Sequence, residues 1–295
     1  MKQSPKCYRF LHRIFILPSK YTLNKMVAGL NVEAGVNIQI LEAVKQEVAK
    51  WEENKKFCSI LFDEVALEPG LTYDKHKDYI KGFVELTERK NDFADHALVF
   101  LLRGAVHKWQ QPLAFYFGKG ATSGVQLKII IKEIIAAVCN TGLLPVALIS
   151  DQGTAFQSAL KSLQEDTRRE QIRAGHKVDD VITVNGHTLS VIYDPPHLIK
   201  GLRNNFLTKN ISYNVKISKW SDIVEVYKTD CNYAHVRLLH KLNDEHVIPE
   251  KNKKMKVKNC VKALSKTMAA TLAYTAQFTQ YVNGDKVSPT LKNTS

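Results

Sequence analysis

The chain has 295 residues, of which 44% are hydrophobic, and its formal net charge is +13 at pH 7. This hydrophobic content is enough for a folded core, so a wholly disordered protein is excluded. The basic excess is concentrated in residues 195–295, which carry 17 Lys/Arg against 7 Asp/Glu. Lys and Arg make most contacts to phosphate, so this distribution suggests a polyanion partner, although a soluble basic surface would have the same composition.

Cysteine usage and hydropathy restrict the location of the protein. The five cysteines are scattered and form no C-x-x-C pair, which argues against a structural zinc site and suggests a reducing compartment. The apolar runs are interrupted by charged residues, so no membrane span is expected. The N-terminus shows no secretory signal. We therefore expect an intracellular protein.

Residues 1–55 have the pattern of helices. Ser4-Pro5 suits a helix start, and apolar residues follow at helical spacing until Pro18. A second apolar stripe runs from Ile38 to Trp51 on a longer helix.

From Phe57 onward, the apolar residues form short runs that are typical of β-strands rather than of helices. The expected order is three strands, helix, strand, helix, strand, which makes a mixed sheet with helices on its faces. Gln164 to Lys177 is charged and is expected to be a solvated, mobile segment. The expected strands are Phe57–Val65, Ala97–Leu102, Leu113–Phe117, Pro145–Asp151 and Thr188–Tyr193, with a short return strand at Tyr79–Leu86; the expected helices are Gly124–Cys139 and Thr154 to about Leu163.

Two of these strands carry an aspartate in or at the end of an apolar run. Asp63 follows Phe57–Phe62, and Asp151 closes Pro145–Ser150. A charge at the end of a buried strand is costly unless something binds it. Two such strands side by side would offer two carboxylates to a hard cation such as Mg²⁺. Alternatively, each aspartate merely caps a turn.

Beyond Leu198 the chain is expected to be helical and basic. Trp220 to Tyr227 forms one amphipathic pattern, and Val257 to Leu272 forms another. Lys258, Lys262 and Lys266 are spaced four apart and would share a face of that second helix. This lysine stripe would either follow a phosphate backbone or simply face solvent.

Several local sequences resemble one known family. Leu61-Phe62-Asp63-Glu64, Ser150-Asp151-Gln152-Gly153 and the long segment from Asp194-Pro195-Pro196-His197 to Asn205 are similar to the P-element transposase family, which includes the THAP-domain transposase-like proteins. The resemblance covers most of the chain. It implies a ribonuclease H-like α/β fold, in agreement with the order of elements.

The resemblance also implies a domain organisation and an activity. The expected parts are a helical segment (1–55), a ribonuclease H-like domain (56–205) and part of a helical GTP-binding insertion (206–295). In the family, three acidic residues hold two metal ions, Mg²⁺ or Mn²⁺, for DNA strand cleavage and transfer. By motif, Asp63 and Asp151 carry over as catalytic and metal-binding residues. The third acid is a glutamate beyond the insertion, and it has no evident counterpart here.

Other residues are weaker candidates. Glu225 and Asp194 are considered as accessory acids, but Glu225 fits a solvated helix position better, and Asp194 precedes two prolines that suit a structural turn. Asp194 and Lys256 are considered for nucleotide binding, with GTP implied by the resemblance. Lys258, Lys262 and Lys266 are the candidate DNA contacts.

The zinc-coordinating finger with which full family members begin is also not evident. We therefore expect a P-element-type transposase fragment or domesticated derivative that is nuclear. Its expected partners are DNA and another transposase chain, in a homo-oligomer, and no membrane. Catalysis is expected to be lost with the third acid. The alternative is a non-catalytic module that binds DNA or protein.

Overall fold

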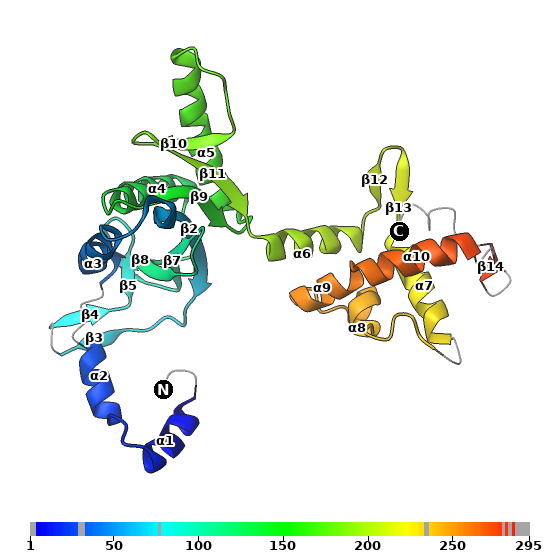
Figure 1. The fold of residues 1–295 in the computed structure, drawn as a ribbon, viewed down its shortest axis with the longest axis horizontal. Coiled ribbons are helices and arrows are strands. Elements are labelled where there is room, and N and C mark those ends of the chain that lie inside the picture. The colour runs from blue at the N-terminus through cyan, green and yellow to red at the C-terminus, as the bar shows by residue number, and fades with distance from the viewer. Residues whose placement is uncertain are drawn as a thin grey trace. The chain divides into compact units, whose positions relative to one another are not determined.

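The structure is a computed structural model. It describes residues 4–28, 33–75, 78–232, 236–278, 281–282 and 285–286. The chain divides into two compact units, Met1–Ile192 and Tyr193–Ser295. Figure 1 shows the helices and strands of both units.

The first unit begins with helices, as the sequence predicts. The side chain of Ser4 accepts a hydrogen bond from the backbone N–H of Cys7 and caps the first helix. Asn37 caps the third helix in the same way through the N–H of Ile40. The helices are α1 (Pro5–Ile14), α2 (Lys20–Ala28) and α3 (Ile38–Val48), followed by the 3₁₀ turn η1 (Glu53–Lys56).

A large sheet forms the centre of the first unit. Five of its strands lie side by side in the spatial order β8-β7-β2-β9-β11. Strand β7 pairs antiparallel with both β2 and β8, whereas β9 pairs parallel with β2. The sheet is therefore mixed, with the predicted meander followed by crossovers. The five strands are β2 (Phe57–Ala66), β7 (His96–Gly104), β8 (Gln110–Gly118), β9 (Leu144–Ser150) and β11 (His187–Tyr193).

Shorter strands extend this sheet or form a separate hairpin. Strands β5 and β6 continue it beyond β8, β1 also pairs with β8, and β10 lies beyond β11. Strands β3 and β4 pair only with each other among the described residues. The bounds are β1 (Gly35–Val36), β3 (Thr72–Asp74), β4 (Tyr79–Lys81), β5 (Phe83–Glu85), β6 (Arg89–Phe93) and β10 (Val181–Val184).

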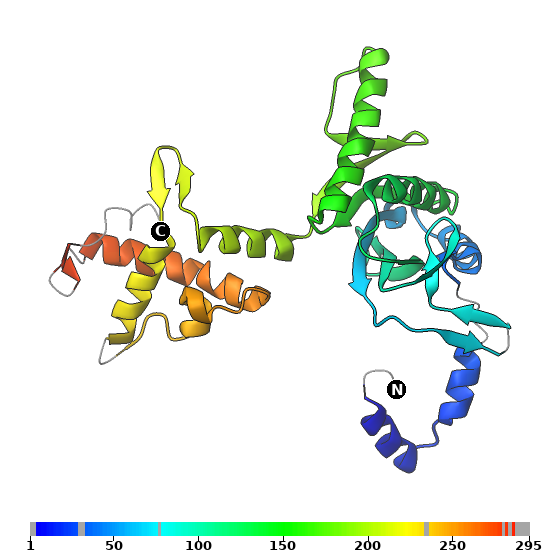
Figure 2. The ribbon, with the colours of Figure 1, turned by 180° about the vertical axis from the view of Figure 1, so that it is seen from behind.

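Two long helices, α4 (Gly124–Cys139) and α5 (Thr154–Arg173), lie against each other beside the sheet (Figures 1 and 2). In both helices the buried side chains recur every three or four residues, which gives each an apolar face. Gly124 permits close packing, because a Cβ there would lie 2.9 Å from Oγ of Ser158. Asp166 on α5 pairs with Lys128 and Lys132 on α4 at 2.7 and 3.1 Å.

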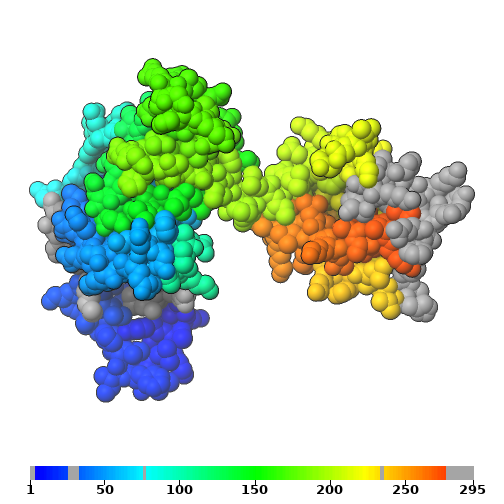
Figure 3. Space-filling model, turned by 45° about the horizontal axis from the view of Figure 1, so that its top comes forward, coloured from blue at the N-terminus to red at the C-terminus, as the bar shows by residue number. Residues whose placement is uncertain are grey.

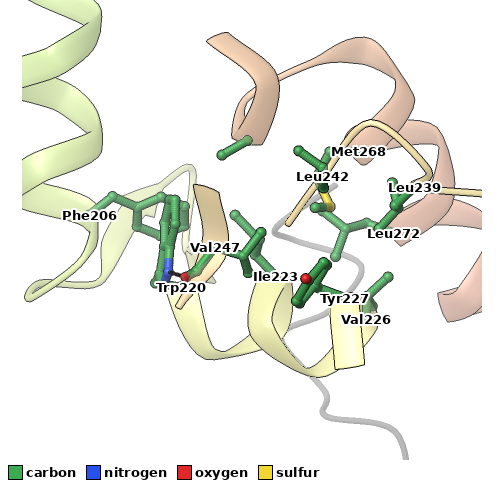
Figure 4. Packing of buried hydrophobic residues seen from close by; sticks show 11 residues of the cluster. Phe206, Trp220, Ile223, Val226, Tyr227, Leu239, Leu242, Val247, Met268 and Leu272 are labelled. Atoms are coloured by element: carbon green, nitrogen blue, oxygen red, sulfur yellow. Dashed lines mark hydrogen bonds between the residues drawn. The ribbon is translucent and has the colours of Figure 1, made fainter. Parts of the chain in front are cut away.

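The second unit is mainly helical around its own apolar core. Trp220 occupies this core, packs edge-on against Phe206 and donates its indole N–H to the carbonyl of Val247 at 2.9 Å (Figure 4). Arg203 is fully buried and donates to the carbonyl of Lys254. The helices are α6 (Pro195–Phe206), α7 (Trp220–Asn232), α8 (Asp244–Val247), η2 (Pro249–Lys251), α9 (Val257–Ala263) and α10 (Lys266–Phe278); the strands are β12 (Ile211–Tyr213), β13 (Lys216–Ser218), β14 (Tyr281–Val282) and β15 (Asp285–Lys286).

The prediction that the segment from Gln164 to Lys177 is mobile is wrong for most of its length. Helix α5 continues through it to Arg173. The hydroxyl oxygen of Thr167 accepts a hydrogen bond from the N–H of Thr183 in β10 at 2.8 Å. Packing on β10, which the sequence analysis missed, therefore holds this charged stretch in helical form.

The prediction of a single strand at Tyr79–Leu86 is also wrong. It is divided into β4 and β5 at Gly82, whose φ is +113°. A Cβ at Gly82 would lie 2.1 Å from the carbonyl oxygen of Gly70, so the backbone passes too closely for any other residue. The two halves consequently pair with different strands.

Candidate acidic site

Asp63 lies near the end of β2. Cys58, Ile60 and Phe62 are buried on one face of the strand, and Phe62 packs against Phe156 of α5. Side chains alternate along a strand, so Asp63 belongs to the opposite face from Phe62, and it is exposed. One of its carboxylate oxygens accepts a hydrogen bond from the N–H of Glu64 at 2.8 Å.

Asp151 directly follows β9 and precedes α5. Its Oδ1 accepts a hydrogen bond from the N–H of Gly153 at 2.9 Å, which closes a turn before the helix. A Cβ at Gly153 would lie 3.1 Å from this same oxygen. Gly153 therefore leaves the space that the carboxylate occupies. The α5 N-terminus nearby also favours a negative charge.

The strand register brings the two aspartates together. Strands β2 and β9 are adjacent and parallel, as expected, and the last printed pair is Leu61 with Ile149. Continuing both chains by two residues places Asp63 level with Asp151. Neighbouring strands lie about 4.8 Å apart, and residues at the same level of a parallel pair share a face. Asp63 and Asp151 thus come at the same end of two adjacent parallel strands.

Glu64 belongs to the other face and makes a different contact. Its Oε1 accepts a hydrogen bond from the backbone N–H of Thr122 at 2.8 Å, just before α4. Glu64 is therefore poorly placed to share a cation with Asp63. The sequence analysis did not identify this contact, because Glu64 and Thr122 are 58 positions apart in the chain.

The donor set partly fits a divalent cation. Carboxylate oxygens are the ligands that Mg²⁺ prefers, and Asp63 and Asp151 supply two such groups within the first unit. Across the residues described by the structure, no group of three or more His, Cys, Asp or Glu side chains is arranged to hold a metal ion. The pair is therefore suitable as part of a metal site rather than as a complete one.

Asp194 and Lys256 lie in the second unit, each at the start of a helix. The side chain of Asp194 caps α6 by accepting from the N–H of His197 at 3.3 Å, and it also contacts Nδ1 of His197 at 2.5 Å. Lys256 is exposed and precedes α9 as its N-cap residue. Their assignment to a metal or nucleotide stays a prediction.

Glu225 lies on α7 among the helices of the second unit. Glu225 was expected to be solvated, but the structure shows that it is half-buried. Burial raises the pKa of its carboxyl group, and the negative charge of Asp222 raises it further. Glu225 belongs to the second unit and the two aspartates to the first, and its assignment as an accessory acid stays a prediction.

The three candidate DNA-contact lysines do not share one helix, which corrects the expected lysine stripe. Lys258 and Lys262 are on α9, whereas Lys266 is the first residue of α10. The break occurs because the hydroxyl of Ser265 accepts from the N–H of Met268 and starts a new helix. In addition, Nζ of Lys262 donates to the carbonyl of Lys241 at 3.1 Å.

Two hollows in the described residues are separate from the predicted site residues. One has a volume of about 410 Å³ and is bordered by α7 and α10 in the second unit, with Asp230 and Tyr274 in its lining. The other, of about 640 Å³, lies in the first unit and is lined in part by Tyr79 and Phe117. Neither lining includes Asp63, Asp151 or Lys256.

Comparison with known proteins connects both units to one family. The family model "TNP-like, RNase H N-terminal domain" matches residues 32–164. The model "TNP-like, GTP-binding insertion domain" matches residues 196–292, a range that includes Glu225. Together the two matches cover more than half of the chain.

One curated protein and one solved structure are also similar. "Transposable element P transposase" of Drosophila melanogaster is 24% identical over 269 residues, which are 91% of this chain and 32% of that protein. A chain of the "Drosophila P element transposase strand transfer complex" aligns with a TM-score of 0.71 and 23% identity, over 95% of this chain and 58% of that one. The present chain thus spans about a third of the curated relative.

The solved structure supports the fold, and the family models support the relationship. A mixed sheet with the strand order described above and helices α4 and α5 against it is a ribonuclease H-like arrangement. Among the described residues, no helix has the length and apolar character to cross a bilayer. On the strength of the two domain matches, this chain belongs to the P-element transposase-like family.

Proposed function

We propose that Asp63 and Asp151 are two of the acidic ligands of a transposase-type site for DNA strand cleavage and transfer. The observation that supports this proposal is the parallel register of β2 and β9, whose last pair, Leu61 with Ile149, lies two residues before Asp63 and Asp151. The bound ion would be Mg²⁺ or Mn²⁺. In such sites the metal activates the attacking oxygen and stabilises the leaving oxygen at phosphorus.

The residues around the pair orient its side chains. The N–H of Gly153 holds Oδ1 of Asp151, and the N–H of Glu64 holds a carboxylate oxygen of Asp63. Ligands fixed in this way need less rearrangement when a cation binds. Glu64 acts on the other face of the sheet, where it attaches the segment before α4 to β2 through Thr122.

A second candidate function is a non-catalytic module that binds DNA or another transposase chain. The observation in its favour is the lack of a third suitably placed ligand among the residues that the structure describes. Two carboxylates do not position two ions for in-line displacement. We therefore expect the 295-residue chain by itself neither to cut nor to join DNA.

The second unit would contribute nucleotide binding, and the protein would act in the nucleus, where its DNA substrate is. GTP is the proposed nucleotide, because residues 196–292 match an insertion domain described as GTP-binding. Asp194 and Lys256 are the proposed contacts. Asp194 would have to keep or exchange its hydrogen bond to the N–H of His197 when it binds a nucleotide.

The test measures cation binding directly. Mn²⁺ binding to the chain would be followed by electron paramagnetic resonance for the wild type, Asp63→Asn and Asp151→Asn. Asp179→Asn serves as the control, because Asp179 is an exposed carboxylate elsewhere in the first unit. We expect both site variants to lose Mn²⁺ binding and the control to retain it. Equal binding by all four proteins contradicts the proposal.

A DNA assay with Mg²⁺ or Mn²⁺ separates the two candidate functions. No cleavage or joining by the wild-type chain is the expected result. Metal-dependent nicking that disappears in both Asp63→Ala and Asp151→Ala would contradict the expected inactivity. It would also return Glu225 and Asp194 to consideration as the third ligand.

A further inference from the structure

The hairpin β12–β13 in the second unit has an unusual tip. Tyr213 pairs with Lys216, and the two residues between them, Asn214 and Val215, have φ angles of +46° and +63°. Two positive φ angles are typical of a type I′ turn, for which Asn-Gly is favoured. Valine is β-branched and rarely adopts this conformation, so Val215 is strained.

The base of the hairpin packs on the core of the unit. Ile211, at the start of β12, packs against the apolar core that includes Phe206 and Trp220. From there the two strands extend away from the helices, and their outer residues lie at the surface (Figures 1 and 3). Among the described residues, β12 and β13 pair only with each other. The outer edges of the ribbon are therefore not paired to another described strand, and residues 212–217 are exposed.

Its exposed side chains include apolar, aromatic and basic ones, together with the neutral Ser212 and Asn214. Val215 is fully exposed, and Tyr213 is 74% exposed. Tyr213 and Lys216 are cross-strand partners, so an aromatic ring and an ammonium group lie on one face near the tip. Ile217 is exposed on the other face.

The charged residues of the segment that contains the hairpin all have the same sign. Residues 195–221 contain five Lys or Arg residues and no Asp or Glu. Lys209 and Lys216 are exposed, and neither forms an ion pair among the described residues. A segment of this length without a carboxylate is complementary to a polyanion and offers nothing to a basic surface. Within this segment, positive and negative charges are not mixed.

We propose that the β12–β13 hairpin is a DNA-contacting ribbon that enters a groove of duplex DNA, with Lys209 and Lys216 at the phosphates. The major groove is wide enough for a two-stranded β-ribbon. Tyr213 and Val215 would then contact sugars and base edges, and the lysines would set the position on the backbone. Val215 thus places an apolar side chain at the tip, although glycine would adopt this backbone conformation without strain. This inference shares with the proposed function only the assumption of a DNA substrate.

The open edges of the ribbon also suit strand addition by another protein. That alternative is less favoured, because it does not require the absence of acidic residues over the whole segment. It predicts a different result, namely that the hairpin variants change self-association and leave DNA binding unchanged. This result would overturn the proposal.

The test compares two charge-matched variants of the whole chain. Binding to a fluorescently labelled duplex, without divalent metal, would be measured by anisotropy over a series of salt concentrations. Lys209→Gln combined with Lys216→Gln removes two charges at the hairpin. Lys228→Gln combined with Lys241→Gln removes two exposed charges elsewhere in the second unit. Circular dichroism would confirm that both variants fold.

The hairpin variant is expected to flatten the dependence of log affinity on log salt by up to about two units, since each phosphate contact contributes about 0.9. The control variant should leave this slope near that of the wild type. Tyr213→Ala should weaken binding severalfold at every salt concentration without changing the slope, because an uncharged contact releases no counterion. Val215→Gly keeps the charges and the turn, and it should retain the wild-type slope.

The outcomes separate this inference from the proposed function. If the wild type binds DNA and the two double variants have the same slope, the hairpin is not the contact, and the proposed function is unaffected. If the wild type binds no DNA even at low salt, the inference fails together with the proposed DNA substrate. Mn²⁺ binding by Asp63 and Asp151 is measured independently of both results.

Discussion

Oε1 of Glu64 accepts a hydrogen bond of 2.8 Å from the backbone N–H of Thr122. Thr122 is buried, and it precedes Ser123, which caps α4. Asp63 and Glu64, which are adjacent in strand β2, thus have different roles. Asp63 presents its carboxylate on one face, while Glu64 attaches the start of a core helix to the other face.

Replacing Glu64 with Ala should destabilise the first unit. The buried N–H of Thr122 would lose its partner, which typically costs about 1–3 kcal/mol. Glu64→Gln keeps an accepting oxygen and should cost less. Urea unfolding would be followed by the fluorescence of Trp51 and Trp109 in a Trp220→Phe background. An equal loss of stability in the Ala and Gln variants would show that the charge of Glu64, rather than this hydrogen bond, stabilises the first unit.

Replacing Gly153 with Ala should weaken Mn²⁺ binding. The added Cβ would lie 3.1 Å from Oδ1 of Asp151, so the carboxylate or the turn has to move. The φ of Gly153 is −54°, which alanine adopts readily, so the first unit should still fold. Gly201→Ala is the control, because a Cβ there meets nothing within 4 Å. Unchanged Mn²⁺ affinity in Gly153→Ala would argue against Asp151 as a ligand.

Glu225→Gln should raise the stability of the second unit at neutral pH. The pKa of Glu225 is raised above its ordinary value of 4.5 by burial, and the folded state therefore binds this proton more tightly than the unfolded state. The resulting stabilisation is present below 4.5 and is lost as the pH rises through the raised pKa. The glutamine variant carries no such dependence at this position.

This pH dependence can be measured from the fluorescence of Trp220 during urea unfolding, with Trp51 and Trp109 replaced by Phe. The advantage of Glu225→Gln should be clear at pH 7 and disappear in acid. Glu250→Gln, at an exposed position, controls for the loss of one negative charge. If Glu225→Gln instead lowers Mn²⁺ affinity without changing stability, Glu225 is an accessory ligand.

The lysine prediction can now be tested in two parts. Lys258 and Lys262 lie on α9 and Lys266 on α10, so they need not follow one phosphate backbone together. Changing all three to Gln should flatten the salt dependence of DNA binding by less than the roughly three units expected of three phosphate contacts. Titrations of Lys258→Gln/Lys262→Gln and of Lys266→Gln would assign the change. An unchanged slope in both variants removes these lysines from the interface.

Local sequence was sufficient for several elements. The bounds of α4 were predicted correctly from Ser123, from apolar residues at helical spacing and from the Asn140-Thr141-Gly142 stop. The strands that carry or precede Asp63 and Asp151 were also predicted, because each is a short apolar run. One available signal was missed. Asn185-Gly186 has the residues of a two-residue hairpin turn, and both have positive φ, between β10 and β11.

Other features depend on contacts between distant segments. The charged second half of α5 stays helical because Thr167 and Gln171 bond to the segment containing β10. The division at Gly82 follows from the close approach of Gly70. The break between α9 and α10 had a local signal in Ser265, but the continuous apolar spacing from Val257 to Leu272 suggested one helix.

By itself, the sequence determined the class of fold, the family and the two aspartates as candidates, because apolar periodicity and characteristic local segments are properties of nearby residues. Tertiary structure decided which residues meet. The register of β2 against β9 places Asp63 level with Asp151, and the packing before α4 assigns Glu64 to the other face. Register arises from the pairing of strands more than 80 positions apart, so no local pattern contains it.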